Sequence, residues 1–135
     1  MKIVYGPKGT GKTKIVIDEA NGIIESAKGH VVFITDTKRY TYDLKYQIRF
    51  LDVTEFDINS EETFEGFIKG IVAANSDNEF IYIDGIARIT KTPLDGLEKF
   101  FALVEKLEKD FDVNFIFTCS CEKDELPAFV KKYAE

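Results

Sequence analysis

Residues 6–13 read G-P-K-G-T-G-K-T and match the pattern G-x-x-x-x-G-K-[ST] at every fixed position. The three glycines in this stretch can adopt backbone conformations that side chains forbid, so the chain can turn tightly here. The backbone N–H groups of such a turn can face inward and bind an anion. The pattern therefore predicts a phosphate-binding loop made of Gly6, Pro7, Lys8, Gly9, Thr10, Gly11, Lys12 and Thr13.

The neighbouring segments suit such a loop. Residues 2–5 (K-I-V-Y) are typical of a short strand, and residues 12–27 carry apolar side chains at helical spacing. A helix that starts at the loop would add its free N–H groups and the positive end of its dipole to the anion site. Lys12 would reach the β- and γ-phosphates, and the Thr13 hydroxyl would hold Mg²⁺. In an empty loop we expect the Lys12 side chain to face solvent. A glycine-rich turn that binds nothing is the alternative.

On these residues and this strand–loop–helix order, the chain resembles the P-loop nucleotide triphosphatases. The resemblance implies a nucleoside triphosphate as ligand, with ATP and Mg²⁺ as the expected cofactors.

Composition narrows the class further. The chain has 135 residues, of which 44% are hydrophobic, so we expect one packed domain covering residues 1–135. The net charge is −6 with no basic run, which argues against a broad nucleic-acid-binding surface and leaves a small local patch open. No apolar run is long enough to span a membrane. Cys119 and Cys121 are expected to be buried free thiols, and a cytoplasmic location is the corresponding expectation.

Apolar runs alternate with segments of helical period. The predicted strands are residues 2–5, 31–35, 80–83 and 113–118, with a short edge strand at 50–53. Helices are predicted over residues 12–27 and 38–47, after a capping box of Asn59 and Glu62, from Thr92 and Pro93 onward, and over 126–133. Residues 86–91 show no period and are predicted to form a loop. Strands that alternate with helices predict an α/β fold, a three-layer sandwich around a mainly parallel sheet of four to five strands.

Asp84 follows the buried strand 80–83 directly. P-loop proteins place an acid at this point to hold the Mg²⁺ shell, so Thr13 and Asp84 are the predicted metal-binding residues. A turn or helix-cap aspartate is the alternative.

The order of segments is similar to that of the RecA-like and AAA-type branch of P-loop proteins. That resemblance implies that the strand 113–118 lies between the P-loop strand and strand 80–83, with strands 31–35 and 50–53 beyond it. It also implies a polar residue that senses the γ-phosphate at the end of this fourth strand, where Thr118 or Ser120 would match. An ordinary strand-end hydroxyl is the alternative.

The branch usually carries a glutamate that polarises water directly after the metal-binding acid, and Gly85 stands there instead. Asp36, at the end of the strand 31–35, could orient water in its place, or could cap the predicted helix 38–47. The predicted catalytic residues are therefore Lys12, Asp36 and Thr118. Arg39, Arg49 and Arg88 are candidates to stabilise transferred phosphate. Tyr40, Tyr42 and Tyr46 could stack on a base, although core packing of Tyr40 and surface placement of the others is the simpler expectation.

Two narrower resemblances remain. Residues 6–13, D-T-K-R-Y from Asp36, and I-D-G ending at Gly85 are similar to thymidine kinase, which implies a small-molecule, nucleoside-type kinase. The chain as a whole resembles small bacterial P-loop ATP-binding proteins, which implies nucleotide binding without a particular cellular role. The expected function is a slow ATPase or nucleotide-dependent switch. The alternatives are such a kinase or a nucleotide-binding module without catalysis. The P-loop strand is expected at an exposed edge of the sheet. The C-terminal helix 126–133 is expected to cover this edge, and pairing of two chains as a symmetric dimer is the alternative. A homo-oligomer or a protein partner therefore stays open.

Overall fold

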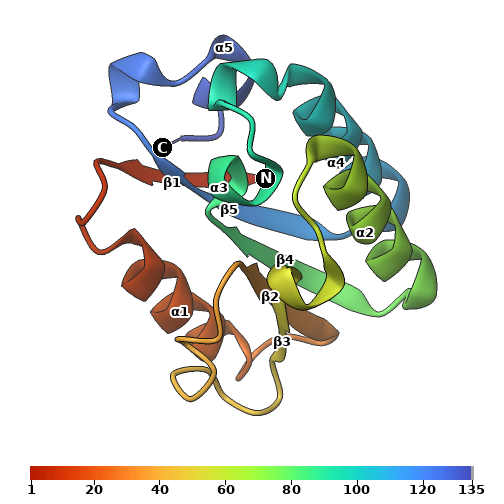
Figure 1. Cartoon of the computed structure of the whole chain (residues 1–135). Helices are drawn as coiled ribbons and strands as arrows, with labels where there is room; N and C mark the ends of the chain where they lie inside the picture. The colour runs from red at the N-terminus through yellow and green to blue at the C-terminus, as the bar shows by residue number, and fades with distance from the viewer. Residues whose placement is uncertain (135) are drawn as a thin grey trace.

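The computed structural model describes residues 1–134 and has an α/β architecture (Figure 1). The named strands form one five-stranded sheet in the order β1-β5-β4-β2-β3, and every pairing between them is parallel. The strands are β1 (Lys2–Gly6), β2 (His30–Thr35), β3 (Arg49–Asp52), β4 (Asn78–Asp84) and β5 (Asn114–Ser120). The order across the sheet is the one predicted from the sequence, and the mainly parallel sheet is confirmed.

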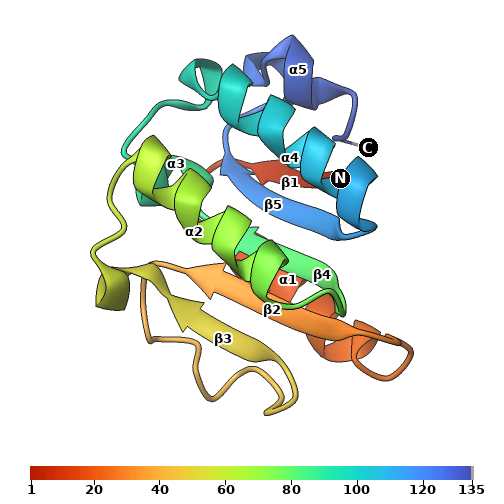
Figure 2. The same ribbon diagram turned by 90° about the vertical axis from the view of Figure 1, so that its right-hand side faces the viewer.

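Helices lie on both faces of this sheet. The helices are α1 (Lys12–Ile23), α2 (Glu61–Ala74), α3 (Ile86–Thr90), α4 (Glu98–Phe111) and α5 (Ala128–Lys131). Helix α1 lies on one face, and α2 and α4 cover the other, as Figure 2 shows. The arrangement is that of a three-layer sandwich. Within residues 1–134 no helix combines the length and the apolar character needed to cross a membrane.

The central strands are buried on both faces because their side chains alternate between two apolar clusters. In β2, Val31 and Phe33 pack with Val16 and Ala20 of α1. The intervening residues of the strand, such as Ile34, belong to a larger cluster with the phenylalanines of α2 and α4. Each central strand contributes side chains to both clusters, so it needs a continuous apolar run. Such a run is easily recognised in the sequence, which is why these strands were predicted well.

Strand β1 lies at one edge of the sheet, as expected, and the C-terminal part of the same chain shields it. The Ile3 N–H donates to the Tyr133 carbonyl at 3.1 Å. At the other end of the strand, Gly6 forms an isolated antiparallel bridge with Cys121. The C-terminal segment therefore satisfies part of this edge, although both contacts come from residues outside α5 rather than from the helix itself.

The predicted helix over residues 38–47 is wrong. Residues 36–48 instead form a series of turns between β2 and β3. The spacing of four residues between Tyr40, Leu44 and Ile48 still predicts which side chains face inward, because all three pack on the α1 side of the sheet. Successive turns can bring these side chains inward just as a helix would, so the period of the sequence alone cannot distinguish a helix from a series of turns.

The loop predicted over residues 86–91 is also wrong, because this segment contains α3. Five residues are too few to display a helical period. The capping box of α2 is made by Ser60 and Thr63 rather than by Asn59 and Glu62. Helix α1 ends earlier than predicted, α4 begins after a 3-10 turn at Leu94–Gly96, and the C-terminal helix shortens to α5.

Candidate functional site

The glycine-rich loop connects the carboxyl end of β1 to the start of α1. Gly9 and Gly11 both have a φ of 84°, in the left-handed region that favours glycine. A Cβ on Gly6 would lie 2.8 Å from the Thr10 hydroxyl oxygen, so this position requires a residue without a side chain. Gly11 caps α1 and offers no side-chain acceptor to it. The first N–H groups of α1 are therefore available to an anion.

Lys12 turns back over this loop. Its ammonium donates to the Pro7 carbonyl at 2.9 Å, and only 8% of the residue is exposed. The Thr10 hydroxyl donates to the same carbonyl at 2.7 Å. The expectation that Lys12 faces solvent is wrong, because the loop is closed enough to give the ammonium a partner within the chain.

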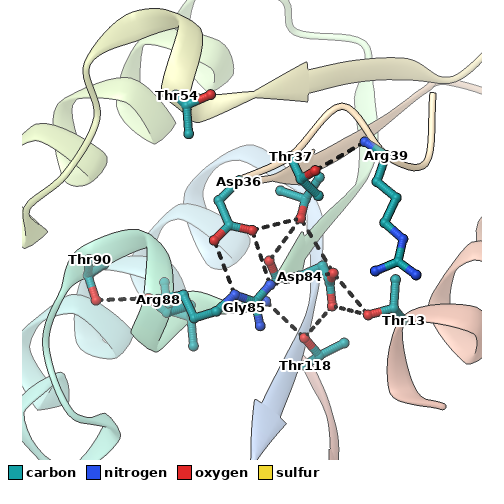
Figure 3. Close-up of polar contacts among 12 residues, drawn as sticks. Thr13, Asp36, Thr37, Arg39, Thr54, Asp84, Gly85, Arg88, Thr90 and Thr118 are labelled. Carbon is teal, nitrogen blue, oxygen red and sulfur yellow. Dashed lines mark hydrogen bonds and ion pairs between the residues drawn. The ribbon is translucent and has the colours of Figure 1, made fainter. Parts of the chain in front are cut away.

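Asp84 ends β4 and is the centre of a group of hydroxyls (Figure 3). Thr13 Oγ1 lies 3.1 Å from both carboxylate oxygens of Asp84, and Thr118 Oγ1 donates to one of them at 2.7 Å. Thr35 Oγ1 is 3.4 Å from the other oxygen. Asp84 is 2% exposed, so these hydroxyls replace much of the hydration that a carboxylate needs. Asp84 thus joins β4 to the loop helix and to both neighbouring strands.

Thr118 lies beside Asp84 in the parallel register of β4 and β5. Its hydroxyl accepts a hydrogen bond from the Gly85 N–H at 2.9 Å while it donates to Asp84. The side chain therefore orients the Asp84 carboxylate and the backbone that follows it. Ser120, the other predicted sensor candidate, is exposed at the end of β5 and also lines the cavity described below.

Asp36 forms a two-pronged ion pair with Arg88 of α3. Arg88 Nε and one terminal nitrogen each lie 3.1 Å from a different oxygen of Asp36. A hydrogen bond to Asp36 is the main cause that raises the pKa of Arg88 above its ordinary value. Asp36 does not cap a helix, because no helix follows it. The geometry joins the end of β2 to α3 across the end of β4.

The position after Asp84 cannot take a side chain without rearrangement. Gly85 has a φ of 90°, and a Cβ built on it would lie 2.3 Å from a terminal nitrogen of Arg88. The guanidinium of Arg88 thus occupies the space into which a glutamate at this position would project. Because Arg88 is held by Asp36, the glycine and the ion pair belong to one local arrangement.

We expect Gly85→Ala to lower the free energy of unfolding by about 2–4 kcal/mol, from the positive φ together with the contact on Arg88. Chemical denaturation measures this change. Gly70→Ala is the matched control, because Gly70 is exposed within α2 and its added Cβ would meet nothing within 4 Å. That control is expected to gain about 0.5–1 kcal/mol from helix propensity. A Gly85→Ala protein as stable as the parent would contradict the assigned strain.

A cavity of about 950 Å³ lies in front of these residues. Its walls come from the glycine-rich loop and α1 on one side and from residues 36–43 on the other. Arg39 and Tyr40 contribute to the second wall, and in Figure 3 the Arg39 side chain extends in the direction of Thr13. Arg49 starts β3, at the opposite end of the parallel strands, and does not line this cavity.

The structure brings the predicted site residues together at the carboxyl ends of the strands. The residues that line the cavity include Lys8, Gly9, Gly11, Lys12, Thr13, Asp36, Asp84, Arg88 and Thr118. The sequence reasoning missed Thr35, which is fully buried and bonds to Asp84. A polar residue at the end of an otherwise apolar strand was the signal. It also missed the pairing of Asp36 with Arg88, because no sequence pattern links residues so far apart.

Neither cysteine lines this cavity, and neither thiol has the lowered pKa of a reactive cysteine. Cys119 is buried as expected, and burial raises the pKa of its thiol to about 12. Cys121 is only partly buried, and burial raises the pKa of its thiol as well. Both thiols therefore stay protonated near neutral pH.

No protein-family model matches the chain, and no curated protein matches it.

Proposed function

We propose that the protein is a P-loop nucleotide-binding protein of the RecA-like type that binds ATP with Mg²⁺ at the glycine-rich loop. The observation that carries this proposal is the placement of Thr13 against Asp84. A hydroxyl at the start of α1 and a buried carboxylate at the end of β4 lie 3.1 Å apart beside a loop of matching sequence. A glycine-rich turn without a ligand does not need this second group.

The loop suits a triphosphate. Gly11 leaves the first N–H groups of α1 without a side-chain acceptor, and the Lys12 ammonium rests on a neutral carbonyl. A phosphate oxygen carries negative charge and is a stronger acceptor for both groups than the Pro7 carbonyl is. Lys12 would exchange this carbonyl for phosphate when the nucleotide binds.

The same site suits Mg²⁺. Thr13 and Asp84 offer one hydroxyl oxygen and one carboxylate, and Mg²⁺ in nucleotide sites is completed by phosphate oxygens and water. Among residues 1–134 no three His, Cys, Asp or Glu side chains gather to hold a metal by themselves. The ion would therefore enter together with the nucleotide, and it would neutralise phosphate charge. Thr118 and Thr35 keep the Asp84 carboxylate directed towards Thr13.

Hydrolysis is proposed to be slow. The position of the usual water-polarising glutamate is Gly85, and Arg88 fills the adjacent space. Asp36 is the carboxylate that the sequence suggests for this role, but both of its oxygens accept hydrogen bonds from Arg88. Water would have to compete with Arg88 for hydrogen bonds to these oxygens. A nucleotide-dependent switch, in which the ion pair changes with nucleotide state, suits this arrangement.

We expect steady-state ATP turnover by the isolated protein well below the enzyme median of about 10 s⁻¹. Phosphate release under saturating Mg²⁺-ATP measures it. If Asp36 supplies the remaining chemistry, Asp36→Asn will lower turnover while ATP affinity is retained. Turnover above the median in the unmodified protein would show that the missing glutamate does not limit the reaction.

A small-molecule kinase is the second candidate function. The observation that favours it is that Asp36 and Arg39 line the same cavity as the glycine-rich loop. An acceptor placed there would lie next to Asp36. Phosphate transfer to an added nucleoside, in preference to water, would support this function over the switch.

One experiment tests the proposed function directly. Binding of ATP, GTP and ADP is measured by calorimetry, with and without Mg²⁺, and phosphate release is followed in parallel. Binding that is tightest for a triphosphate and strengthened by Mg²⁺ is expected. ATP binding without turnover would leave a nucleotide-binding module, and no binding of any of the three nucleotides would refute the proposal.

A further inference from the structure

A second surface of the molecule displays aromatic side chains in an unusual way. Tyr42 and Tyr46 are 98% and 93% exposed. Both lie in residues 37–49, which we call the tyrosine segment; it runs past α1 and joins β2 to β3 (Figure 1). Aromatic rings usually bury most of their area, so two almost fully exposed rings in one short segment need a reason.

The exposure of these rings is built into the fold. Leu44 and Ile48 of the same segment are buried against the α1 side of the sheet. The Asn21 side chain on α1 donates to the Asp43 carbonyl and accepts from the Lys45 N–H, at 2.8 and 2.9 Å. The backbone is thus fastened next to both tyrosines, and the rings point outward from an anchored segment.

The tyrosine segment also differs in charge from the rest of the chain. It contains Lys38, Arg39, Lys45 and Arg49 but a single acid, Asp43, whereas the whole protein has a net charge of −6. Lys45 pairs with Glu25, and Lys38 lies 3.8 Å from Glu55. The Arg39 guanidinium lies 5.7 Å from the centre of the Tyr40 ring. Basic and aromatic side chains are therefore neighbours in this segment, and Lys38 and Lys45 would exchange Glu55 and Glu25 for phosphate.

We propose that the tyrosine segment binds single-stranded nucleic acid. A single strand offers phosphates for the basic side chains and unpaired base faces for the tyrosine rings. A duplex stacks its bases internally, so it could use only the charges. An acidic peptide would use the charges, but it has no series of flat base faces for the rings. This small patch agrees with the absence of any broad basic surface.

The proposal does not depend on nucleotide binding at the glycine-rich loop, so it is tested without nucleotide. Fluorescence anisotropy is measured with labelled single strands of about 15 nucleotides, one of DNA and one of RNA, and with a duplex of equal length. We expect a single strand to bind more tightly than the duplex, with binding weakened between about 50 and 200 mM salt. The DNA and RNA arms show which single strand is the ligand.

The variants separate stacking from charge. The double variant Tyr42→Ala with Tyr46→Ala is expected to bind at least about tenfold more weakly, and the corresponding double change to Phe is expected to bind like the parent, because a ring still stacks. Arg49→Gln should weaken binding and reduce the salt dependence. The matched control is Lys99→Gln, which removes an exposed cation from α4 and should change nothing.

Because both tyrosines are almost fully exposed, the double alanine variant should melt like the parent, which circular dichroism checks. The proposal is overturned if neither single strand binds at low salt, if the duplex binds equally well, or if the alanine variant binds with parental affinity. The first of these results would leave a protein as the partner for the exposed rings.

Discussion

Lys12→Ala is expected to abolish detectable nucleotide binding, a loss of at least about 100-fold in affinity, with the fold intact. The ammonium is the cation held over the glycine-rich loop, 2.9 Å from the Pro7 carbonyl. Alanine removes the charge that would meet the β- and γ-phosphates. Calorimetric titration with Mg²⁺-ATP measures the loss.

The structure also predicts how stability will respond to this change. The Pro7 carbonyl keeps the Thr10 hydroxyl as a donor when Lys12 is shortened, so the free energy of unfolding should change by no more than about 1 kcal/mol. Lys99→Ala, on the exposed side of α4, is the control for removal of a lysine charge. Unchanged ATP affinity in Lys12→Ala would refute the proposal that the glycine-rich loop binds the phosphates of the nucleotide.

Asp84→Asn is expected to weaken Mg²⁺-ATP binding by about 10- to 100-fold, while binding of metal-free ATP changes by no more than about threefold. The neutral amide is a poorer Mg²⁺ ligand than the carboxylate, but it keeps an oxygen that can accept from the Thr13 and Thr118 hydroxyls. The measurement is ATP affinity as a function of Mg²⁺ concentration.

Asp52→Asn is the matched control for this variant. Asp52 also ends a strand and is 3% exposed, but its carboxylate accepts from the Thr54 N–H and caps a 3-10 turn. That variant should cost about 1 kcal/mol of stability and leave the Mg²⁺ effect unchanged. If Asp84→Asn lowered the affinity for ATP equally with and without Mg²⁺, Asp84 would be a structural aspartate, and the proposed role in metal binding would be refuted.

Both variants test groups that already have partners within the chain. Lys12 donates a hydrogen bond to the Pro7 carbonyl, Thr13 donates one to Asp84, and Asp36 accepts one from Arg88. If a nucleotide binds here with Mg²⁺ as proposed, these internal contacts would be exchanged for contacts to phosphate and metal. Because Asp84 also lies 3.9 Å from a terminal nitrogen of Arg88 in α3, we propose that this exchange would be the physical basis of the switch.

Much of the fold was predictable because its signals are local. Strands β2, β4 and β5 are continuous apolar runs that need both faces covered, and their alternation with helical segments implies a parallel sheet. The glycine-rich loop could be located because its backbone requires glycine at Gly9 and Gly11, whatever surrounds it. Asp84 could be located because a charged residue ended a buried strand.

The errors fall where local signals are ambiguous. Residues 38–47 have buried side chains at helical spacing, but turns fastened by Asn21 produce the same pattern. Helix α3 has only five residues, and its N-cap residue Gly85 has a positive φ that no sequence period reveals. Boundaries and short elements depend on contacts with the rest of the molecule.

By itself, the sequence determined the alternation of strands and helices, the position of the loop and the chemical character of its residues, because each depends on neighbours in the chain. Only the tertiary structure decided that Asp36 pairs with Arg88, that Thr35 and Thr118 hold Asp84, and that Arg88 excludes a side chain at Gly85. These contacts join residues dozens of positions apart. They arise because parallel strands bring their carboxyl ends to one edge of the sheet, and pairing a buried charge there lowers its free energy.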